Sequence, residues 1–558
     1  MRNSYPTGSS RAGRTISPSS PGRRTRLIQA ALAIPVALVI AGAIPFLNAA
    51  PKASGTGVKK QTLADAPPRL VVVLVVDQFR SDYLDYYRSE FGDAGLMRLM
   101  REGAVFRECF YPYAITETGP GHATLATGTT PDRHGIGANQ WFNPELGKDM
   151  YAMFDENSPV VGGTPGQTPV SPRNLNGTTL SDEMRLATGG KSLVFGVALK
   201  DRASILSTGH GANAAYWYDS SGTGFVTSTY YRGLLPEWVL AFNKTHAVQL
   251  STEPTARRRE LGTFRESAAA NRLVSEFAMG LVDNERLGRD ETTDFLFIGF
   301  SANDYTGHRY GPYSEEVRKI THETDVAVAD LLRQLDAKVG RGKYWFVFSA
   351  DHGVAPSLAE ARDASLAHLD AKNIDVKAVR AAMEAKLSER WGSAHWLLPV
   401  EGLYLDRKVL TEKNARLEEA VRIAGEAAEK MPGVWGYVSR FGSRMPESII
   451  NSYQRSNPPG RGPDLEIVPL PFALPDMDKG GTTHGTPFTY DTQVPLILVG
   501  APFVPGEYYQ RCSPADMAMT LSAMLHIHSP SLANGRVLAE SFPARSAAAS
   551  AATREAQP

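Results

Sequence analysis

The sequence predicts an α/β fold: a mostly parallel central sheet with helices on both faces and an inserted cap. Four apolar, β-branched or aromatic runs have the continuous hydrophobicity of strands buried on both faces, at residues 70–76, 295–300, 344–348 and 494–499. A fifth run, 193–198, follows a predicted helix over 179–188 that ends at Gly189. Strands therefore alternate with helices, which is typical of the α/β class.

The first 50 residues predict a targeting segment. Six arginines and no acidic residue precede an apolar run over 27–47, and small residues follow it. This is the pattern of a secretory signal peptide, but the run is also nearly long enough for an uncleaved membrane anchor. Both interpretations predict export to the periplasm or beyond, with membrane attachment only in the second. Cys109 and Cys512 then form a disulfide or remain buried free thiols, and the sequence leaves both open.

The rest of the chain predicts one enlarged catalytic domain over residues 68–540. Two insertions interrupt it: a Gly- and Pro-rich stretch at 143–176, and a cap at 353–480. Within the cap, residues 411–430 have a helical pattern, while 403–405 and 434–438 are strand-like. The Ala- and Ser-rich tail at 544–558 predicts disorder.

The charge balance argues against nucleic acid as a partner. The chain has 59 basic and 59 acidic residues, and six of the basic ones lie in the first 50 residues. The exported part is therefore mildly acidic, and we see no basic stripe in it. An anionic substrate would have to be held locally, by a metal and a few cations.

Polar side chains follow three of the predicted strands. Asp77 ends the first, Asp304 lies just past the second, and Asp351 with His352 closes the third. In open α/β sheets ligands bind at the carboxyl ends of the strands, so these groups are expected at one site. With His308 and His484 they form a set of carboxylate and imidazole ligands without cysteine, which favours catalytic zinc.

A candidate nucleophile precedes a helix-compatible run. Thr118 is followed by Gly-Pro-Gly, so it is expected at a helix N-terminus with small neighbours. Backbone N–H groups and the helix dipole favour an anion there. A threonine in this position is more often a simple cap, so the motif alone is weak.

The motifs together resemble the alkaline phosphatase superfamily. They are Val-Val-Asp77-Gln, Thr118-Gly-Pro-Gly-His, Asp304-Tyr-Thr-Gly-His308, Ser-Ala-Asp351-His352-Gly and Thr-His484-Gly. The resemblance implies two zinc ions per chain. One would be held by Asp304, His308 and His484, the other by Asp77, Asp351, His352 and the oxygen of Thr118. It also implies that Thr118 attacks phosphorus and forms a phosphothreonine intermediate.

The resemblance leaves the substrate open, and three further residues narrow it. Lys200 and Arg202, after the fifth strand, resemble the cationic clamp of a monoesterase subgroup, and Asn139 matches its amide donor. We therefore expect an exported zinc-dependent alkaline phosphatase acting on small-molecule phosphate monoesters. The alternatives are a phosphodiesterase or nucleotide pyrophosphatase and, from another class, a non-catalytic phosphate-binding protein. A sulfatase is disfavoured because Thr118 stands where that chemistry needs a modifiable Cys or Ser.

Overall fold

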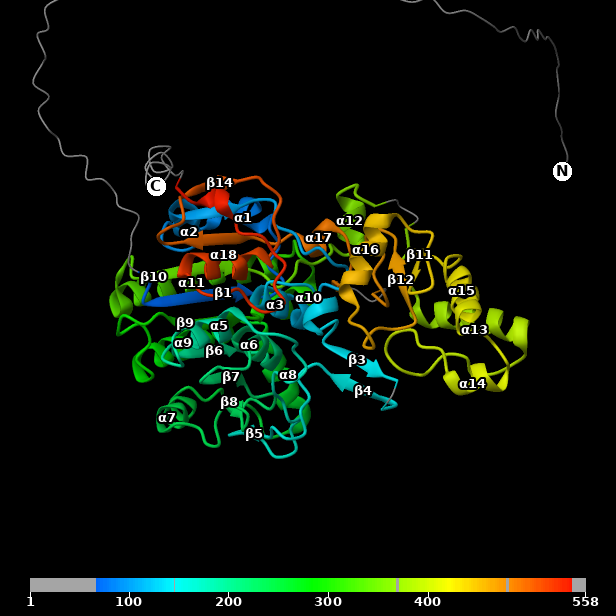
Figure 1. The fold of residues 1–558 in the computed structure, drawn as a ribbon, viewed down its shortest axis with the longest axis horizontal. Coiled ribbons are helices and arrows are strands. Elements are labelled where there is room, and N and C mark those ends of the chain that lie inside the picture. The colour runs from blue at the N-terminus through cyan, green and yellow to red at the C-terminus, as the bar shows by residue number, and fades with distance from the viewer. Residues whose placement is uncertain (1–66, 145, 368–370, 478–480, 544–558) are drawn as a thin grey trace, which may run out of the picture. The chain divides into compact units, whose positions relative to one another are not determined.

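The computed structural model describes residues 67–144, 146–367, 371–477 and 481–543, and its centre is a ten-stranded sheet (Figure 1). Five neighbouring strands in its middle are parallel to one another. In sheet order the strands are β14 (Gly506–Tyr508), β2 (Gly103–Phe106), β13 (Leu496–Val499), β10 (Tyr344–Ser349), β1 (Leu70–Val76), β9 (Asp294–Phe300), β6 (Val194–Ala198), β7 (Ala214–Tyr218), β8 (Phe225–Ser228) and β5 (Val160–Val161).

The five predicted strands are all present, but one of them runs in an unexpected direction. The run at 494–499 becomes the shorter strand β13, which pairs antiparallel with β10 on one side and with β2 on the other. Our expectation that it joins the parallel set is wrong. A continuous apolar run indicates burial on both faces and carries no information on strand direction.

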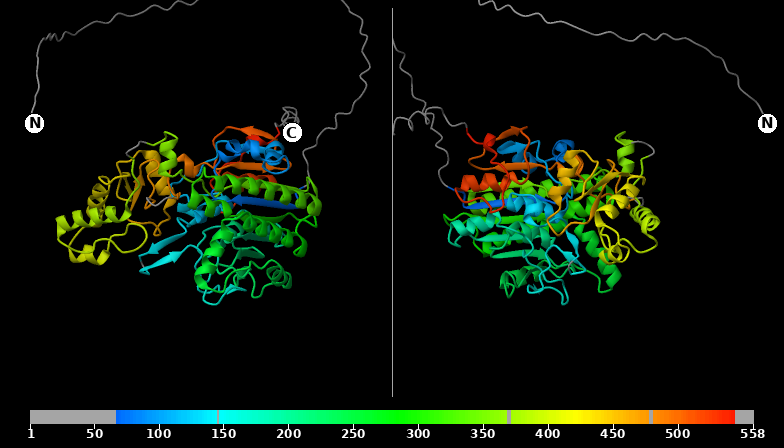
Figure 2. Two further views of the ribbon diagram at one scale, coloured as in Figure 1. Left: turned by 180° about the vertical axis from the view of Figure 1, so that it is seen from behind. Right: turned by 45° about the vertical axis from the view of Figure 1, so that its right-hand side comes forward.

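Helices cover both faces of the sheet, and Figure 2 shows the layers from two further sides. One layer contains α2 (Leu96–Glu102), α8 (Pro254–Arg265), α9 (Ala268–Asn284), α10 (Ala302–Tyr310) and α11 (Glu315–Leu335). The other contains α3 (Thr118–Thr127), α5 (Leu180–Ala187), α6 (Asp201–Thr208) and α18 (Asp516–Leu525). Short helices in the connections are α1 (Tyr83–Tyr86), α4 (Pro131–His134), α7 (Glu237–Thr245) and α17 (Thr489–Thr492).

The insertion predicted at 143–176 is partly absorbed into the main sheet. Strand β3 (Gln140–Asn143) pairs with β4 (Lys148–Tyr151) as an antiparallel hairpin. Further along, β5 pairs with β8 at the edge of the large sheet. The hairpin follows Asn139 directly, so it starts at a predicted site residue.

The segment predicted as a cap, 353–480, has a hydrophobic cluster of its own around the buried Trp396. Its elements are α12 (Leu358–Asp363), α13 (Val376–Trp391), α14 (Arg407–Glu412), α15 (Leu417–Ala428), β11 (Val434–Ser439), α16 (Glu447–Ser456) and β12 (Leu465–Pro469). The single helix expected over 411–430 is wrong: Asn414 has a φ of 49°, and this left-handed residue ends α14 before α15 begins. Leu403 and Leu405 make only isolated bridges.

Some sequence predictions fall on other parts of the chain. The targeting segment at 1–50 and the tail at 544–558 lie outside the described residues. Within the described ranges, no helix combines the length and apolar character needed to cross a membrane. Cys109 and Cys512 are buried free thiols that face each other across a parallel bridge.

A buried carboxylate on α11 fixes the loop that leads into α2. Asp325 is 2% exposed and accepts hydrogen bonds from the backbone N–H groups of Gly92 (2.8 Å) and Leu96 (2.6 Å). We expect Asp325→Ala to lower the free energy of unfolding by about 1–3 kcal/mol, because the buried N–H of Leu96 and the partly buried N–H of Gly92 lose their acceptor. Thermal or urea unfolding measures this. Asp330→Ala on the exposed side of the same helix is the control, and an equal loss there would contradict the assignment.

Candidate metal centre and active site

The predicted nucleophile begins a buried helix. Thr118 is the first residue of α3 and is 2% exposed, and Glu117 occupies the N-cap position in extended conformation. Helix α3 packs backbone to backbone against the loop after β10, because a Cβ on Gly121 would lie 2.1 Å from the carbonyl oxygen of Asp351. Only glycine permits this approach, and it brings the nucleophile's helix to the carboxyl ends of the strands.

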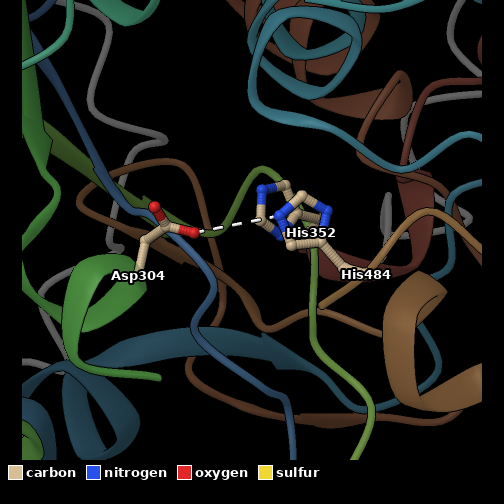
Figure 3. A group of neighbouring side chains, drawn as sticks. All are labelled: Asp304, His352 and His484. Carbon is tan, nitrogen blue, oxygen red and sulfur yellow. Dashed lines mark ion pairs between the residues drawn. The ribbon is translucent and has the colours of Figure 1, made fainter. Parts of the chain in front are cut away.

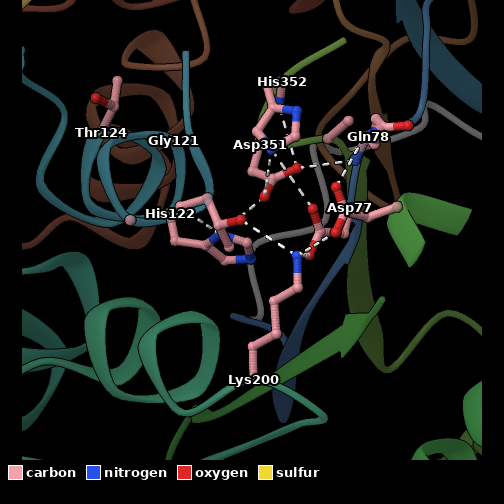
Figure 4. Close-up of polar contacts among 12 residues, drawn as sticks. Asp77, Gln78, Gly121, His122, Thr124, Lys200, Asp351 and His352 are labelled. Atoms are coloured by element: carbon pink, nitrogen blue, oxygen red, sulfur yellow. Dashed lines mark hydrogen bonds and ion pairs between the residues drawn. The ribbon is translucent and has the colours of Figure 1, made fainter. Parts of the chain in front are cut away.

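The first ligand group consists of Asp77, Asp351 and His352, whose ligand atoms all lie within 4.8 Å of one another (Figure 4). Oδ1 of Asp351 accepts from the backbone N–H groups of Gln78 (3.1 Å) and His352 (3.0 Å). Its Oδ2, Oδ1 of Asp77 and Nε2 of His352 are buried without a hydrogen-bond partner among the described residues, and Oδ2 of Asp77 has only the ammonium of Lys200, at 2.5 Å. Buried acceptors of this kind fit a bound cation.

The second ligand group consists of Asp304, His352 and His484 (Figure 3). Nε2 of His484 lies 3.9 Å from Oδ1 of Asp304, and Nε2 of His308 lies 3.2 Å from the same oxygen. The rings of His352 and His484 stack with centroids 3.7 Å apart. His352 is therefore common to both groups, whereas the resemblance assigned it to one metal only.

Backbone carbonyls orient all three imidazoles. Each Nδ1 lies close to a backbone carbonyl oxygen. The distances are 2.9 Å from His308 to Thr482, 2.6 Å from His484 to Thr116 and 2.9 Å from His352 to Gly353. A carbonyl only accepts, so each Nδ1 carries the proton, and in the neutral ring the Nε2 lone pair is available to a metal. Such contacts are typical of metal-binding histidines.

Charge and burial act in opposite directions on these rings. Burial lowers the pKa of His352 to about 4 and holds that of His484 well below its usual range, so both are neutral ligands. For His308 burial is outweighed by Asp304, and the pKa rises to about 9. A metal at this site therefore competes with a proton for Nε2 of His308.

Lys200 connects both ligand groups to the nucleophile. It occupies the N-cap position of α6 without capping it through its side chain, and its Nζ lies 2.5 Å from Oδ2 of Asp77, 2.6 Å from Oδ2 of Asp304 and 3.3 Å from Oγ1 of Thr118. Burial opposes the ammonium charge, but Asp304 and then Asp77 raise the pKa of Lys200 above its ordinary value. Lys200 is thus a permanently charged cation at the oxygen that would attack phosphorus.

The other two predicted phosphate contacts differ in how they are held: Asn139 is fixed by hydrogen bonds, whereas Nε of Arg202 has no hydrogen-bond partner among the described residues. The side-chain Oδ1 of Asn139 accepts a hydrogen bond from the backbone N–H of Gly119 (2.8 Å). The backbone N–H of Asn139 donates to Oε2 of Glu117 (2.7 Å). The amide orientation leaves the Asn139 NH₂ as its remaining donor group. Arg202, in the first turn of α6, lines the same 570 Å³ cavity as Lys200.

Sequence reasoning missed Gln78, which links the two ligand groups. Its Nε2 donates to Oδ1 of Asp304 (2.8 Å), and its backbone N–H donates to Asp351. Its φ of 64° is unusual for a residue other than glycine and allows both contacts. The only signal in the sequence is its position directly after Asp77. Glu117, which supports Asn139, was missed in the same way.

The comparisons with known proteins agree with this geometry. A model of the type I phosphodiesterase / nucleotide pyrophosphatase family matches residues 71–476. Alkaline phosphatase PafA of Elizabethkingia meningoseptica is 35% identical over 530 residues, which are 86% of this chain and 96% of that protein. This chain belongs to the type I phosphodiesterase / nucleotide pyrophosphatase family, within the alkaline phosphatase superfamily.

Other members of the superfamily extend the match. Alkaline phosphatase PhoV of Synechococcus elongatus is 30% identical over 85% of this chain and 93% of its own. The crystal structure of wild-type PafA superposes with a TM-score of 0.80 at 32% identity, covering 86% of this chain and all of that one. A second PafA structure carries substitutions of one threonine, one asparagine, one lysine and one arginine. These residue types occur in the same chain order as Thr118, Asn139, Lys200 and Arg202.

Members of this family depend on metal, and the ligand groups predict that metal also stabilises this fold. We expect a chelator to remove bound metal and lower the thermal midpoint. The stabilisation lost is about 2.7 kcal/mol when free metal had been about one hundred times its Kd.

Asp351→Asn should lower the metal content measured by elemental analysis. Asp155→Asn is the control, because this buried carboxylate is satisfied by Ser158 and Ser171 away from the site. An unchanged metal content in Asp351→Asn would contradict the ligand assignment.

Proposed function

We propose that this protein is an exported, zinc-dependent alkaline phosphatase that hydrolyses phosphate monoesters through a phosphothreonine intermediate. The observation that carries the proposal is the buried ammonium of Lys200, 3.3 Å from the Thr118 hydroxyl and within 2.6 Å of one carboxylate from each ligand group. The named relatives PafA and PhoV are both alkaline phosphatases, which supports it.

The ligand set supports two zinc ions, because carboxylates and imidazoles without thiolates are usual at catalytic zinc sites. Asp304, His308 and His484 would hold one ion. Asp77, Asp351, His352 and Thr118 would hold the other, with His352 close to both. When bound, the ions would lower the pKa of the Thr118 hydroxyl and stabilise charge on the departing oxygen.

The residues of the chain then have distinct tasks. Oγ1 of Thr118 loses its proton and attacks phosphorus in line, the ester oxygen leaves as the alcohol, and water later releases inorganic phosphate from the phosphothreonine. Burial at the start of α3 keeps the hydroxyl fixed beside the phosphate. Asn139, Lys200 and Arg202 would bind the non-bridging oxygens, the two cations balancing the dianion.

The proposed specificity for monoesters follows from the two positive charges of Lys200 and Arg202. A phosphate monoester has three free oxygens and two negative charges, whereas a diester replaces one oxygen by an alkoxy group. Two cationic side chains at the non-bridging oxygens therefore favour the monoester. The runner-up, a phosphodiesterase or nucleotide pyrophosphatase, shares the two ligand groups and is named in the family description.

The remaining parts of the proposal rest on the sequence. Export follows from the N-terminal pattern at residues 1–50, with the periplasm or extracellular space as the destination and a membrane anchor only if that segment stays attached. The partners are small phosphate esters. The mildly acidic exported part gives no support for nucleic acid binding.

A comparison of substrates tests the proposed reaction. With zinc-loaded protein we expect kcat/KM to be much greater for an aryl phosphate than for the matching bis-aryl phosphate, because only the monoester satisfies both cations. Thr118→Ala should lose covalent phosphate labelling and both activities. Dominant turnover of the diester would assign the protein to the phosphodiesterases, and no turnover of either ester at full zinc content would favour a phosphate-binding protein.

The cationic residues have a separate test. Lys200→Ala and Arg202→Ala should each lose about ten- to one-hundred-fold in kcat/KM for the monoester, and less for the diester, because each removes a charge-assisted contact worth about 1.5–3 kcal/mol. Zinc content is measured in parallel, since Lys200 also contacts two metal ligands. Lys338→Ala, which removes a lysine paired with Asp283 at the surface, is the control. Equal losses on both esters would contradict the clamp.

A further inference from the structure

The hairpin of β3 and β4 lies between two of the proposed phosphate contacts, Asn139 and Arg202. Asn139 immediately precedes β3, and Tyr151 is the last residue of β4. Gln140 pairs with Tyr151 across the hairpin. Next to this pair, the backbone N–H of Ala152 donates to the backbone carbonyl oxygen of Asn139 (2.9 Å). The position of Tyr151 is therefore set by the same backbone pairing that holds Asn139 beside the nucleophile's helix.

At the other end of this connection, Tyr151 reaches the first turn of α6. Its hydroxyl donates to Oδ1 of Asp201 at 2.6 Å, and the same carboxylate oxygen accepts from the backbone N–H of Arg202 at 2.7 Å. Burial and the nearby Asp201 raise the pKa of the Tyr151 hydroxyl, Arg202 acts to lower it, and Tyr151 and Arg202 line the same cavity. A phenol that donates to a carboxylate still has lone pairs, so it can accept from the guanidinium at the same time.

The guanidinium of Arg202 has a donor that is not used. Its Nε is buried and has no hydrogen-bond partner among the described residues. Tyr151 and Arg202 both line the 570 Å³ cavity that also contains Lys200. Without the tyrosine, the long side chain would be free to adopt other rotamers in this space.

We infer that Tyr151 is a positioning residue that aims Arg202 at the phosphate and thereby contributes to monoester specificity. This inference rests on the proposed function. Tyr151 acts only through Arg202 and Asp201, and it supplies no charge of its own. Its burial and the nearby Asp201 hold the pKa of the Tyr151 hydroxyl well above its usual range, so the hydroxyl remains a donor.

The hairpin also packs against the cap segment, and it does so through residues other than Tyr151. On β3, Gln140 donates to Glu401 and the Phe142 ring packs edge-on against Tyr404, with centroids 5.2 Å apart. These contacts join the hairpin to the cap segment. Loss of the Tyr151 hydroxyl leaves them intact, so its effect separates aiming of Arg202 from docking of the cap.

Tyr151→Phe tests the inference because it removes the hydroxyl and keeps the ring. We expect kcat/KM for the aryl phosphate to fall about three- to ten-fold, the range for one hydrogen bond, with less than about two-fold change for the bis-aryl phosphate. The inhibition constant for inorganic phosphate should rise by a similar factor. Tyr218→Phe is the matched control: Tyr218 lines the same cavity but donates to the oxygen of Gly222.

A double-mutant cycle with Arg202→Ala completes the test. If Tyr151 acts through Arg202, Tyr151→Phe causes no further loss once Arg202 is absent. Equal losses on both esters, or the same loss with and without Arg202, would overturn the role of Tyr151 while leaving the clamp intact. A lack of selectivity in Arg202→Ala itself would instead refute the clamp, and the role of Tyr151 with it.

Discussion

The rest of this structure depends on the confinement of three carboxylates at one edge of the sheet. Asp77, Asp304 and Asp351 are nearly inaccessible to water, and ionised carboxylates cannot be buried without compensating cations. Lys200 supplies one positive charge between Asp77 and Asp304. The acceptor atoms that remain without hydrogen bonds match the needs of metal ions, so the folding of this edge and the chemistry proposed for it have the same electrostatic origin.

The sheet makes this confinement possible. Strands β10, β1 and β9 are parallel neighbours, so the residues that follow them emerge side by side. Two local features close the remaining distance. Gly121 allows α3 to approach the backbone of Asp351, and the left-handed Gln78 contacts carboxylates of both ligand groups. The energetic cost of these exceptions is met by the large buried core beneath them.

In the proposed function, monoester specificity comes from other elements than the candidate metal ligands do. The candidate metal ligands follow β1, β9 and β10 or lie in the loop before α17, whereas Lys200 and Arg202 come from the start of α6 and Asn139 directly precedes a hairpin. Lys200 also contacts two candidate ligands, so among these residues Asn139 and Arg202 are the ones whose changes would alter ester selection with the least effect on metal binding. A division of this kind is consistent with the general rule that one fold can carry different activities.

The sequence by itself determined the α/β class, the strands and a set of candidate site residues that the fold brings together, because buried strands and metal ligands require particular residue types at local spacings. It did not determine the direction of β13 or the break at Asn414, since apolar runs indicate burial without direction and a left-handed residue is not visible in a helical pattern. Nor did it reveal that His352 belongs to both ligand groups, or that Gln78, Glu117 and Tyr151 support the site. Those facts depend on contacts between segments far apart in the chain, and only the tertiary structure, which sets side-chain directions and distances, could decide them.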